Sequence, residues 1–200
     1  MAPPATLLFA LGGYLVGNFP TAVLVARSRG HDVAHEGSGN PGATNVYRIA
    51  GRKAGAVVFG GDLAKGALVT GIALALSGRD AALAGGAASV VGHCFPVTRR
   101  FRGGKGVATA AGFSMVIEPI LVLAAAVVWA VTVKAVGRAS VGSLVVAIGF
   151  PVAVLLWRGP HAETAVVAGV AALVVARHAQ NISRLLRGEE STLRGSSKEQ

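Results

Sequence analysis

Cysteine and charged residues are both scarce in this chain of 200 residues. Its single cysteine, Cys94, excludes an internal disulfide and any metal site built from several cysteines, and a small core residue is the simplest interpretation of it. Only 14% of the residues are charged, whereas 52% are hydrophobic and the mean hydropathy is +0.59. Such a chain is too apolar for an ordinary soluble domain of this size, so we expect it to lie in a bilayer.

Acidic residues are scarce as well. The chain has 9 Asp and Glu residues against 19 Lys and Arg residues, which gives a formal net charge of +10. A balance this basic can indicate nucleic-acid binding, so the position of the charges decides its meaning. On the topology predicted below, all but three of the 19 Lys and Arg residues lie on the cytoplasmic side of a membrane. This asymmetry follows the positive-inside rule and predicts no nucleic-acid partner.

Apolar segments predict an all-α integral membrane protein with a bundle of seven transmembrane helices. They cover residues 6–26, 54–76, 81–97, 106–117, 120–136, 140–157 and 163–176. Segment 106–117 is short enough to be a re-entrant half-helix, but parity with its neighbours requires it to cross. No Lys or Arg precedes the first segment, so we expect a permanent span rather than a signal peptide. The N-terminus would lie outside and the C-terminus in the cytoplasm, with one membrane domain over residues 1–190 and a disordered tail over 191–200.

A basic, glycine-rich stretch at residues 92–109 lies between two of these spans. Its basic residues and loop glycines are Arg99, Arg100, Arg102, Lys105, Gly103, Gly104 and Gly106. The stretch fails the P-loop pattern because Gly106, not Ser or Thr, follows Lys105. Glycines reach positive φ easily, so consecutive N–H groups can turn toward one anion, and a helix starting at Lys105 would add its positive end. We interpret the stretch as a phosphate cradle, with a basic loop that only sets topology as the alternative.

A second polar loop is expected on the same membrane face. It offers hydroxyl, amide and guanidinium donors beside glycines, from Ser38, Asn40, Thr44, Asn45 and Arg48. A loop so rich in donors and so poor in acids favours a phosphate ligand.

Two further groups of polar residues fall on predicted helices. Asp62 and Lys65 are three residues apart within a span, so they share a helical face and must meet protein, each other or a polar cavity. A structural ion pair is the alternative to a role in the site. His178, Asn181 and Arg184 repeat at three-residue spacing on the last helix, which favours anion binding at its inner end.

The sequence contains no readable Ser-His-Asp triad and no spaced set of His, Asp and Glu for a metal. The acids expected near the inner face are only Asp32, Glu36, Asp62 and the glutamates of the tail. We therefore predict a reaction in which the protein positions phosphates and neutralises charge, and needs no protein nucleophile.

Four motifs, in order, resemble those of the bacterial acyl-phosphate:glycerol-3-phosphate acyltransferases, the PlsY family. They lie at residues 37–48, 62–66, 92–109 and 178–189, and the similarity runs from about residue 13 to residue 190. The resemblance implies transfer of a fatty acyl group from acyl phosphate to the 1-hydroxyl of sn-glycerol 3-phosphate. The products would be lysophosphatidate and phosphate, in the first acylation of phospholipid synthesis. It also implies no cofactor, no metal, and an active site on the cytoplasmic side of the bacterial inner membrane.

Matching positions imply roles for individual residues. The predicted catalytic residues are Lys105, His178 and Asn181. The predicted substrate-binding residues are Ser38, Asn40, Asn45, Arg48, Asp62, Lys65, Gly103, Gly104, Gly106 and Ser143. The resemblance further implies substrate-assisted chemistry, in which the phosphate of the donor takes the proton of the attacking hydroxyl.

The sequence departs from the family pattern at Asn18, at His35-Glu36 and at Ala139, outside the four motifs. These departures concern substrate preference more than activity. A transporter of phosphate esters and a scaffold for anionic lipids are the alternative functions. The sequence predicts neither the acyl chain length nor the oligomeric state.

Overall fold

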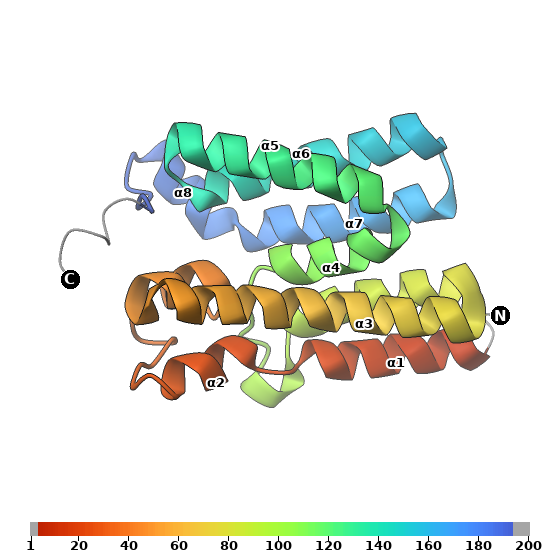
Figure 1. Cartoon of the computed structure of the whole chain (residues 1–200), viewed down its shortest axis with the longest axis horizontal. Helices are drawn as coiled ribbons and strands as arrows, with labels where there is room; N and C mark the ends of the chain where they lie inside the picture. Colours follow the sequence, from red (N-terminus) through yellow and green to blue (C-terminus); the bar gives the residue numbers. More distant parts are fainter. Residues whose placement is uncertain (1–3, 194–200) are drawn as a thin grey trace. The chain divides into compact units, whose positions relative to one another are not determined.

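The computed structural model describes residues 4–193, and every regular element in that range is helical (Figure 1). The chain divides into two compact units, Met1–Ile117 and Glu118–Gln200. The all-α prediction is therefore confirmed for the described residues. Of the tail predicted to be disordered, residues 194–200 lie outside the described residues.

The first unit contains four α-helices and one short 3-10 helix. They are α1 (Pro4–Gly17), α2 (Thr21–Arg27), α3 (Ala43–Cys94), η1 (Val97–Arg99) and α4 (Val107–Ile117). The 52 residues of α3 are not one straight helix, because Gly51 and Gly78 take non-helical conformations with φ of 86° and 81°. The break at Gly78 is the turn predicted between the second and third spans, and the break at Gly51 separates the short helical stretch 43–50 from the second span.

Close contacts through glycine pack α1 and α4 against α3. A Cβ atom on Gly13 would lie 2.2 Å from the carbonyl oxygen of Gly85, and one on Gly17 would lie 2.2 Å from that of Ser89. In the part of α3 before Gly78, a Cβ atom on Gly112 would lie 2.0 Å from the carbonyl oxygen of Leu63. Small residues let helix backbones approach in a bilayer, where hydrophobicity itself does not drive helices together. Figure 1 shows α1 running alongside α3 as a result.

The second unit is built from α5 (Pro119–Val136), α6 (Ala139–Arg158), α7 (Ala162–Arg177) and α8 (Ala179–Leu186). Gly137 ends α5 in the left-handed conformation with φ of 76°, where glycine carries no steric penalty. An ion pair of 2.6 Å between Glu118 Oε1 and Arg158 Nε joins the start of α5 to the end of α6.

Length and composition make the chain an integral membrane protein. Four helical segments of the described chain are long and apolar enough to cross a bilayer, and a fifth results if α7 and α8, bent by 53°, count as one span. Large apolar side chains remain exposed, for example Leu8, Ile120 and Leu156 at 68%, 71% and 82%. Lipid is the solvent that suits such a surface.

The first predicted span corresponds to a candidate span over Pro4–Arg27, which is broken between α1 and α2, where Pro20 precedes α2 and cannot supply a backbone N–H. One predicted helix start was wrong. The helix expected to start at Lys105 begins at Val107, because Gly106 takes a positive φ of 85°.

Candidate active site

Asn45 organises the polar loop that precedes α3. Its side chain is 1% exposed, and its Oδ1 accepts a hydrogen bond of 2.8 Å from the backbone N–H of Ser38. Its Nδ2 donates to the carbonyl oxygens of Val33 at 3.2 Å and Glu36 at 3.0 Å. All three contacts fold the loop, so the structure places Asn45 as an anchor that presents the exposed Ser38.

The acids of this loop are paired with neighbouring histidines. His35 Nδ1 lies 2.8 Å from Asp32 Oδ2, and His31 Nδ1 lies 2.7 Å from Glu36 Oε2. The hydrogen bond with His35 is the main cause that lowers the pKa of Asp32, and the one with His31 lowers the pKa of Glu36. The lowered pKa values keep both carboxylates ionised at neutral pH, and both acids are engaged by hydrogen bonds within the loop.

Asp62 and Lys65 form the ion pair that their spacing predicts. Lys65 Nζ lies 2.9 Å from Asp62 Oδ1, and both side chains are almost fully buried. The sequence did not predict the third member, His93, whose Nδ1 lies 2.8 Å from Lys65 Nζ. Lys65 Nζ also lies 3.4 Å from the carbonyl oxygen of Phe19, in the break between α1 and α2.

These side chains open onto a narrow crevice of about 150 Å³, its mouth included. It is lined by Phe19, Pro20, Thr21, Ala22, Pro41, Asp62, Lys65, His93 and Arg99. The Nε of Arg99 and the Oγ1 of Thr21 are buried and have no hydrogen-bond partner among residues 4–193. Pro41, from the first polar loop, thus shares a crevice with the ion pair of α3.

The glycine-rich loop lies directly on His93. The N–H of Gly104 donates 3.1 Å to the carbonyl oxygen of His93, so it does not turn toward an anion as the cradle interpretation expects. A Cβ atom on Gly103 would lie 2.1 Å from that same oxygen, and one on Gly104 would lie 2.2 Å from His93 Nε2. Of these glycines and Gly106, all within the described chain, Gly106 alone takes a positive φ. Gly103 and Gly104 are therefore required for close approach rather than for a special conformation.

Backbone strain occurs at two residues that precede the glycine-rich loop. Arg100 and Phe101 take positive φ values of 52° and 61° although neither is glycine. Such conformations cost about 1–3 kcal/mol each and concentrate at functional sites. The N–H of Phe101 donates 2.9 Å to the carbonyl oxygen of Pro96, which closes the turn that leads from α3 into the glycine-rich loop.

In the second unit, Glu190 is the centre of a buried hydrogen-bond network. Its carboxylate accepts from Ser140 Oγ at 2.6 Å, Asn181 Nδ2 at 2.5 Å and Arg184 Nε at 2.8 Å. Burial raises the pKa of Glu190, but these three hydrogen bonds outweigh it and lower the pKa below its usual value. Sequence reasoning had grouped this residue with the acids of the tail.

The predicted stripe of His178, Asn181 and Arg184 does not lie on one straight helix. His178 stands at the junction of α7 and α8, where the chain bends by 53°. Its Nδ1 lies 2.8 Å from the carbonyl oxygen of Val174, so Nδ1 carries a proton and donates. Asn181 and Arg184 instead both bind Glu190, while the Oδ1 of Asn181 is buried without a hydrogen-bond partner in the described part of the chain.

The remaining predicted residues occupy different surroundings. Ser143 is buried on α6. Its hydroxyl donates a hydrogen bond of 2.9 Å to the carbonyl oxygen of Ala139 and accepts one of 3.2 Å from Trp129 Nε1. Arg48, Asn40 and Lys105 are half-buried, each at an end of a helix or in a loop. The structure thus joins Asp62, Lys65 and the glycine-rich loop through His93, and it joins Asn181 to Glu190.

An all-helical chain with an apolar exterior, buried charges and strained polar loops defines an integral membrane protein with a polar functional site. A family model described as glycerol-3-phosphate acyltransferase matches residues 7–188. The glycerol-3-phosphate acyltransferase of Syntrophotalea carbinolica is 43% identical over 187 residues, which cover 92% of this chain and 95% of that protein. The one of Cupriavidus pinatubonensis is 45% identical over 195 residues, covering 94% and 96%.

Solved structures agree with these relatives. The crystal structure of PlsY (YgiH), an integral membrane glycerol 3-phosphate acyltransferase, in its glycerol 3-phosphate form matches with a TM-score of 0.90 at 34% identity. Its lysophosphatidic acid form matches with a TM-score of 0.87, and both matches cover 94% of each chain. This chain belongs to the glycerol-3-phosphate acyltransferase family and is an acyltransferase enzyme. The family resemblance of its motifs is confirmed.

Proposed function

We propose that this enzyme transfers a fatty acyl group from acyl phosphate to the 1-hydroxyl of sn-glycerol 3-phosphate, giving lysophosphatidate and inorganic phosphate. The observation that carries the proposal is the likeness, over 94% of the chain, to PlsY in its glycerol 3-phosphate and lysophosphatidic acid forms. Those two forms correspond to the acceptor and the product of the reaction. Acyl phosphate as the donor is supported by the family resemblance of the motifs.

The residues predicted from the motifs take these roles under this proposal. The catalytic residues are Lys105, His178 and Asn181. The residues that bind substrate are Ser38, Asn40, Arg48, Gly106 and Ser143, whereas Gly103 and Gly104 act by letting the loop approach His93. Asn45 acts by presenting Ser38, since its amide hydrogen bonds are spent within the loop.

The chemistry needs little from the protein beyond placement and charge. The 1-hydroxyl oxygen attacks the acyl carbonyl carbon, the bond from that carbon to the phosphate oxygen breaks, and the departing phosphate takes the hydroxyl proton. Lys105 offsets the negative charge of the phosphates, which repel each other as the substrates approach. The Oδ1 of Asn181, buried without a partner in the described chain, is an acceptor suited to orient a substrate hydroxyl.

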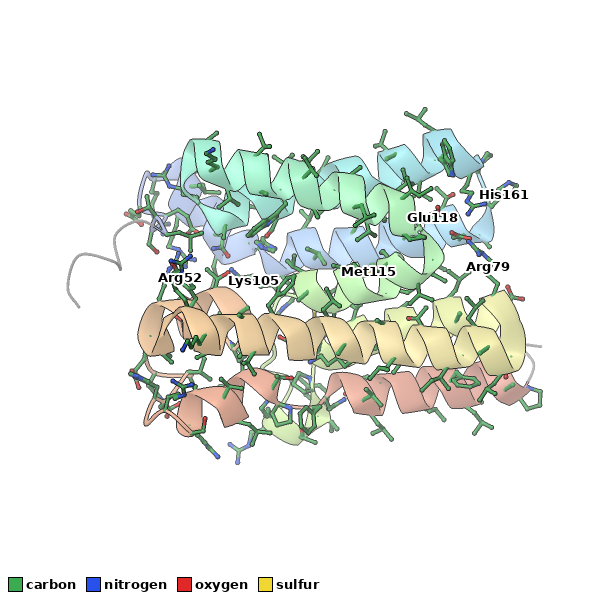
Figure 2. The ribbon with its side chains drawn as sticks, in the orientation of Figure 1. Arg52, Arg79, Lys105, Met115, Glu118 and His161 are labelled. Atoms are coloured by element: carbon green, nitrogen blue, oxygen red, sulfur yellow. The ribbon has the colours of Figure 1, made fainter. Side chains whose placement is uncertain are left out.

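The proposed topology has seven spans in one membrane domain over residues 1–190, with the N-terminus outside and the C-terminus and site in the cytoplasm. Figure 2 supports the orientation within the first unit, where Arg52 and Arg79 lie at opposite ends. Figure 2 also shows Lys105 nearer to the end of Arg52 than to that of Arg79, and the positive-inside rule puts such a basic end in the cytoplasm. On this topology α4 crosses the membrane although it is short. It leads directly into the turn before α5, and parity with the neighbouring spans requires that turn to lie outside.

A donor comparison tests the proposal. Purified protein in lipid-like detergent is mixed with glycerol 3-phosphate and either acyl phosphate or acyl-CoA, and lysophosphatidate is measured. We expect product with acyl phosphate alone. Product with acyl-CoA at a similar rate, or none from a folded sample with acyl phosphate, would reject the proposed donor.

A further inference from the structure

Asp62, Lys65 and His93 form a buried cluster in contact with the loop that carries Lys105. Their side chains are 4%, 6% and 7% exposed, although all three are ionisable. A charged group inside a span is costly unless it is paired, so the arrangement needs a reason beyond packing. The crevice that they line is narrow, about 150 Å³ with its mouth included, so burial this deep leaves a substrate little access to these side chains.

The proton positions within the cluster follow from its geometry. The ammonium of Lys65 has only donors, so the Nδ1 of His93, 2.8 Å away, must accept a hydrogen bond. His93 is then neutral and carries its proton on Nε2. Asp62 Oδ1 lies 2.9 Å from Lys65 Nζ but 3.6 Å from His93 Nδ1, so the carboxylate binds the lysine and acts on the imidazole through it.

The opposite edge of the His93 ring faces the glycine-rich loop. A Cβ atom on Gly104 would lie 2.2 Å from His93 Nε2, and the carbonyl oxygen of His93 accepts the N–H of Gly104. His93 therefore holds Gly104 by a backbone hydrogen bond, its ring leaves no room for a side chain there, and the next residue is Lys105. A chain of contacts runs from Asp62 through Lys65 and His93 to the residue before Lys105.

We propose that Asp62, Lys65 and His93 are positioning residues: they set the place of the Gly103–Gly106 loop, and through it of Lys105, and they do not bind substrate. The proposal rests on the proposed role of Lys105 in binding a phosphate. It replaces the direct substrate contact predicted for Asp62 and Lys65, and it goes further than a structural ion pair because it couples that pair to turnover.

His93→Asn is the first test, because the Oδ1 of asparagine can still accept from Lys65 while the contact of Nε2 with Gly104 is lost. We expect a folded protein whose melting temperature stays within a few degrees of the parent. Its kcat/KM should fall by about 10- to 100-fold, mostly through a higher KM for a phosphate substrate, since a displacement of about 1 Å is enough for such a loss. Thr70→Val is the matched control: Thr70 is also buried on α3, and its hydroxyl donates a hydrogen bond of 2.7 Å to the carbonyl oxygen of Gly66.

The double variant Asp62→Asn/Lys65→Met is the second test, since it removes both charges without leaving one buried and unpaired. A folded double variant with a similar loss of kcat/KM supports the proposal. A folded His93→Asn or double variant with unchanged kinetics overturns it, and loss of folding in both overturns it in favour of a purely structural pair. Lys105→Ala, assayed in parallel, separates the role of Lys105 from the positioning role of the cluster. If Lys105→Ala retains activity, the role of Lys105 is rejected. If Lys105→Ala is inactive while the cluster variants stay active, only the positioning role is rejected.

Discussion

At the scale of single residues, the glycine-rich loop combines one cation with glycines that allow close contact. Lys105 follows Gly104, which is held on His93, and precedes Gly106, which turns the chain into α4. The position of Lys105 is therefore determined on both sides by backbone constraints. This is the pre-organisation expected of a residue that offsets phosphate charge.

Replacing Lys105 by alanine should abolish turnover while the protein still inserts and folds. The loop would keep its glycines and lose the cation next to them, so we expect activity to fall by at least about 100-fold. Phosphate release from acyl phosphate is measured with purified protein of unchanged melting temperature. Lys53→Ala, at an exposed position on α3, is the control and should be as active as the parent.

Gly104→Ala should be nearly as severe, for a steric reason. The added Cβ atom would lie 2.2 Å from His93 Nε2, so the loop or the imidazole must move. Gly60→Ala adds a methyl group on α3 with nothing within 4 Å, and it should leave kcat/KM unchanged. Equal activity in the two variants would contradict the close approach of the loop to His93.

At the scale of elements, the carboxylate of Glu190 ties α8 to α6. Ser140 comes from α6, and Asn181 and Arg184 come from α8, so one buried acid that follows α8 joins these two helices. Arg138, which precedes α6, also donates a hydrogen bond of 2.9 Å from its Nε to the carbonyl oxygen of Glu190. The position of Asn181 thus depends on this acid.

Glu190→Gln should lower the melting temperature and the activity together. A hydrogen bond to a charged group contributes about 1.5–3 kcal/mol, and the substitution removes the charge from three of them. The pKa of Glu190 is lowered in the folded state, so its stabilisation is present above the unfolded pKa and is lost as pH falls through the lower folded pKa. Thermal melts of parent and variant should therefore converge in acid, while Glu189→Gln, at an exposed ion pair, should melt like the parent at every pH.

The sequence predicts the elements better than the contacts between them. The pairing of Asp62 with Lys65 could be predicted because residues i and i+3 share a helical face. The turn at Gly78 could be predicted because a polar run interrupts the apolar pattern. The contact of Lys65 with His93 spans 28 residues and that of Ser140 with Glu190 spans 50, so both depend on packing that no local pattern records. For the same reason, the bend at His178 was missed, since no proline or glycine marks it.

At the scale of the whole molecule, the proposed orientation is the property that decides which substrates can reach the site. Single cysteines introduced at Arg79 and Arg52, in a variant that lacks Cys94, should react differently with an impermeant thiol reagent added to intact cells. We expect labelling at position 79 and protection at position 52 until the membrane is opened. Labelling in the reverse order would contradict an outside N-terminus.

The chemical outcome tests the central claim most directly. Purified enzyme is given acyl phosphate and glycerol 3-phosphate, and lysophosphatidate and inorganic phosphate are quantified in the same sample over time. We predict that the two products appear in equal amounts and that neither forms when glycerol 3-phosphate is omitted. Phosphate release without lysophosphatidate, or lysophosphatidate without matching phosphate, would contradict acyl transfer from acyl phosphate.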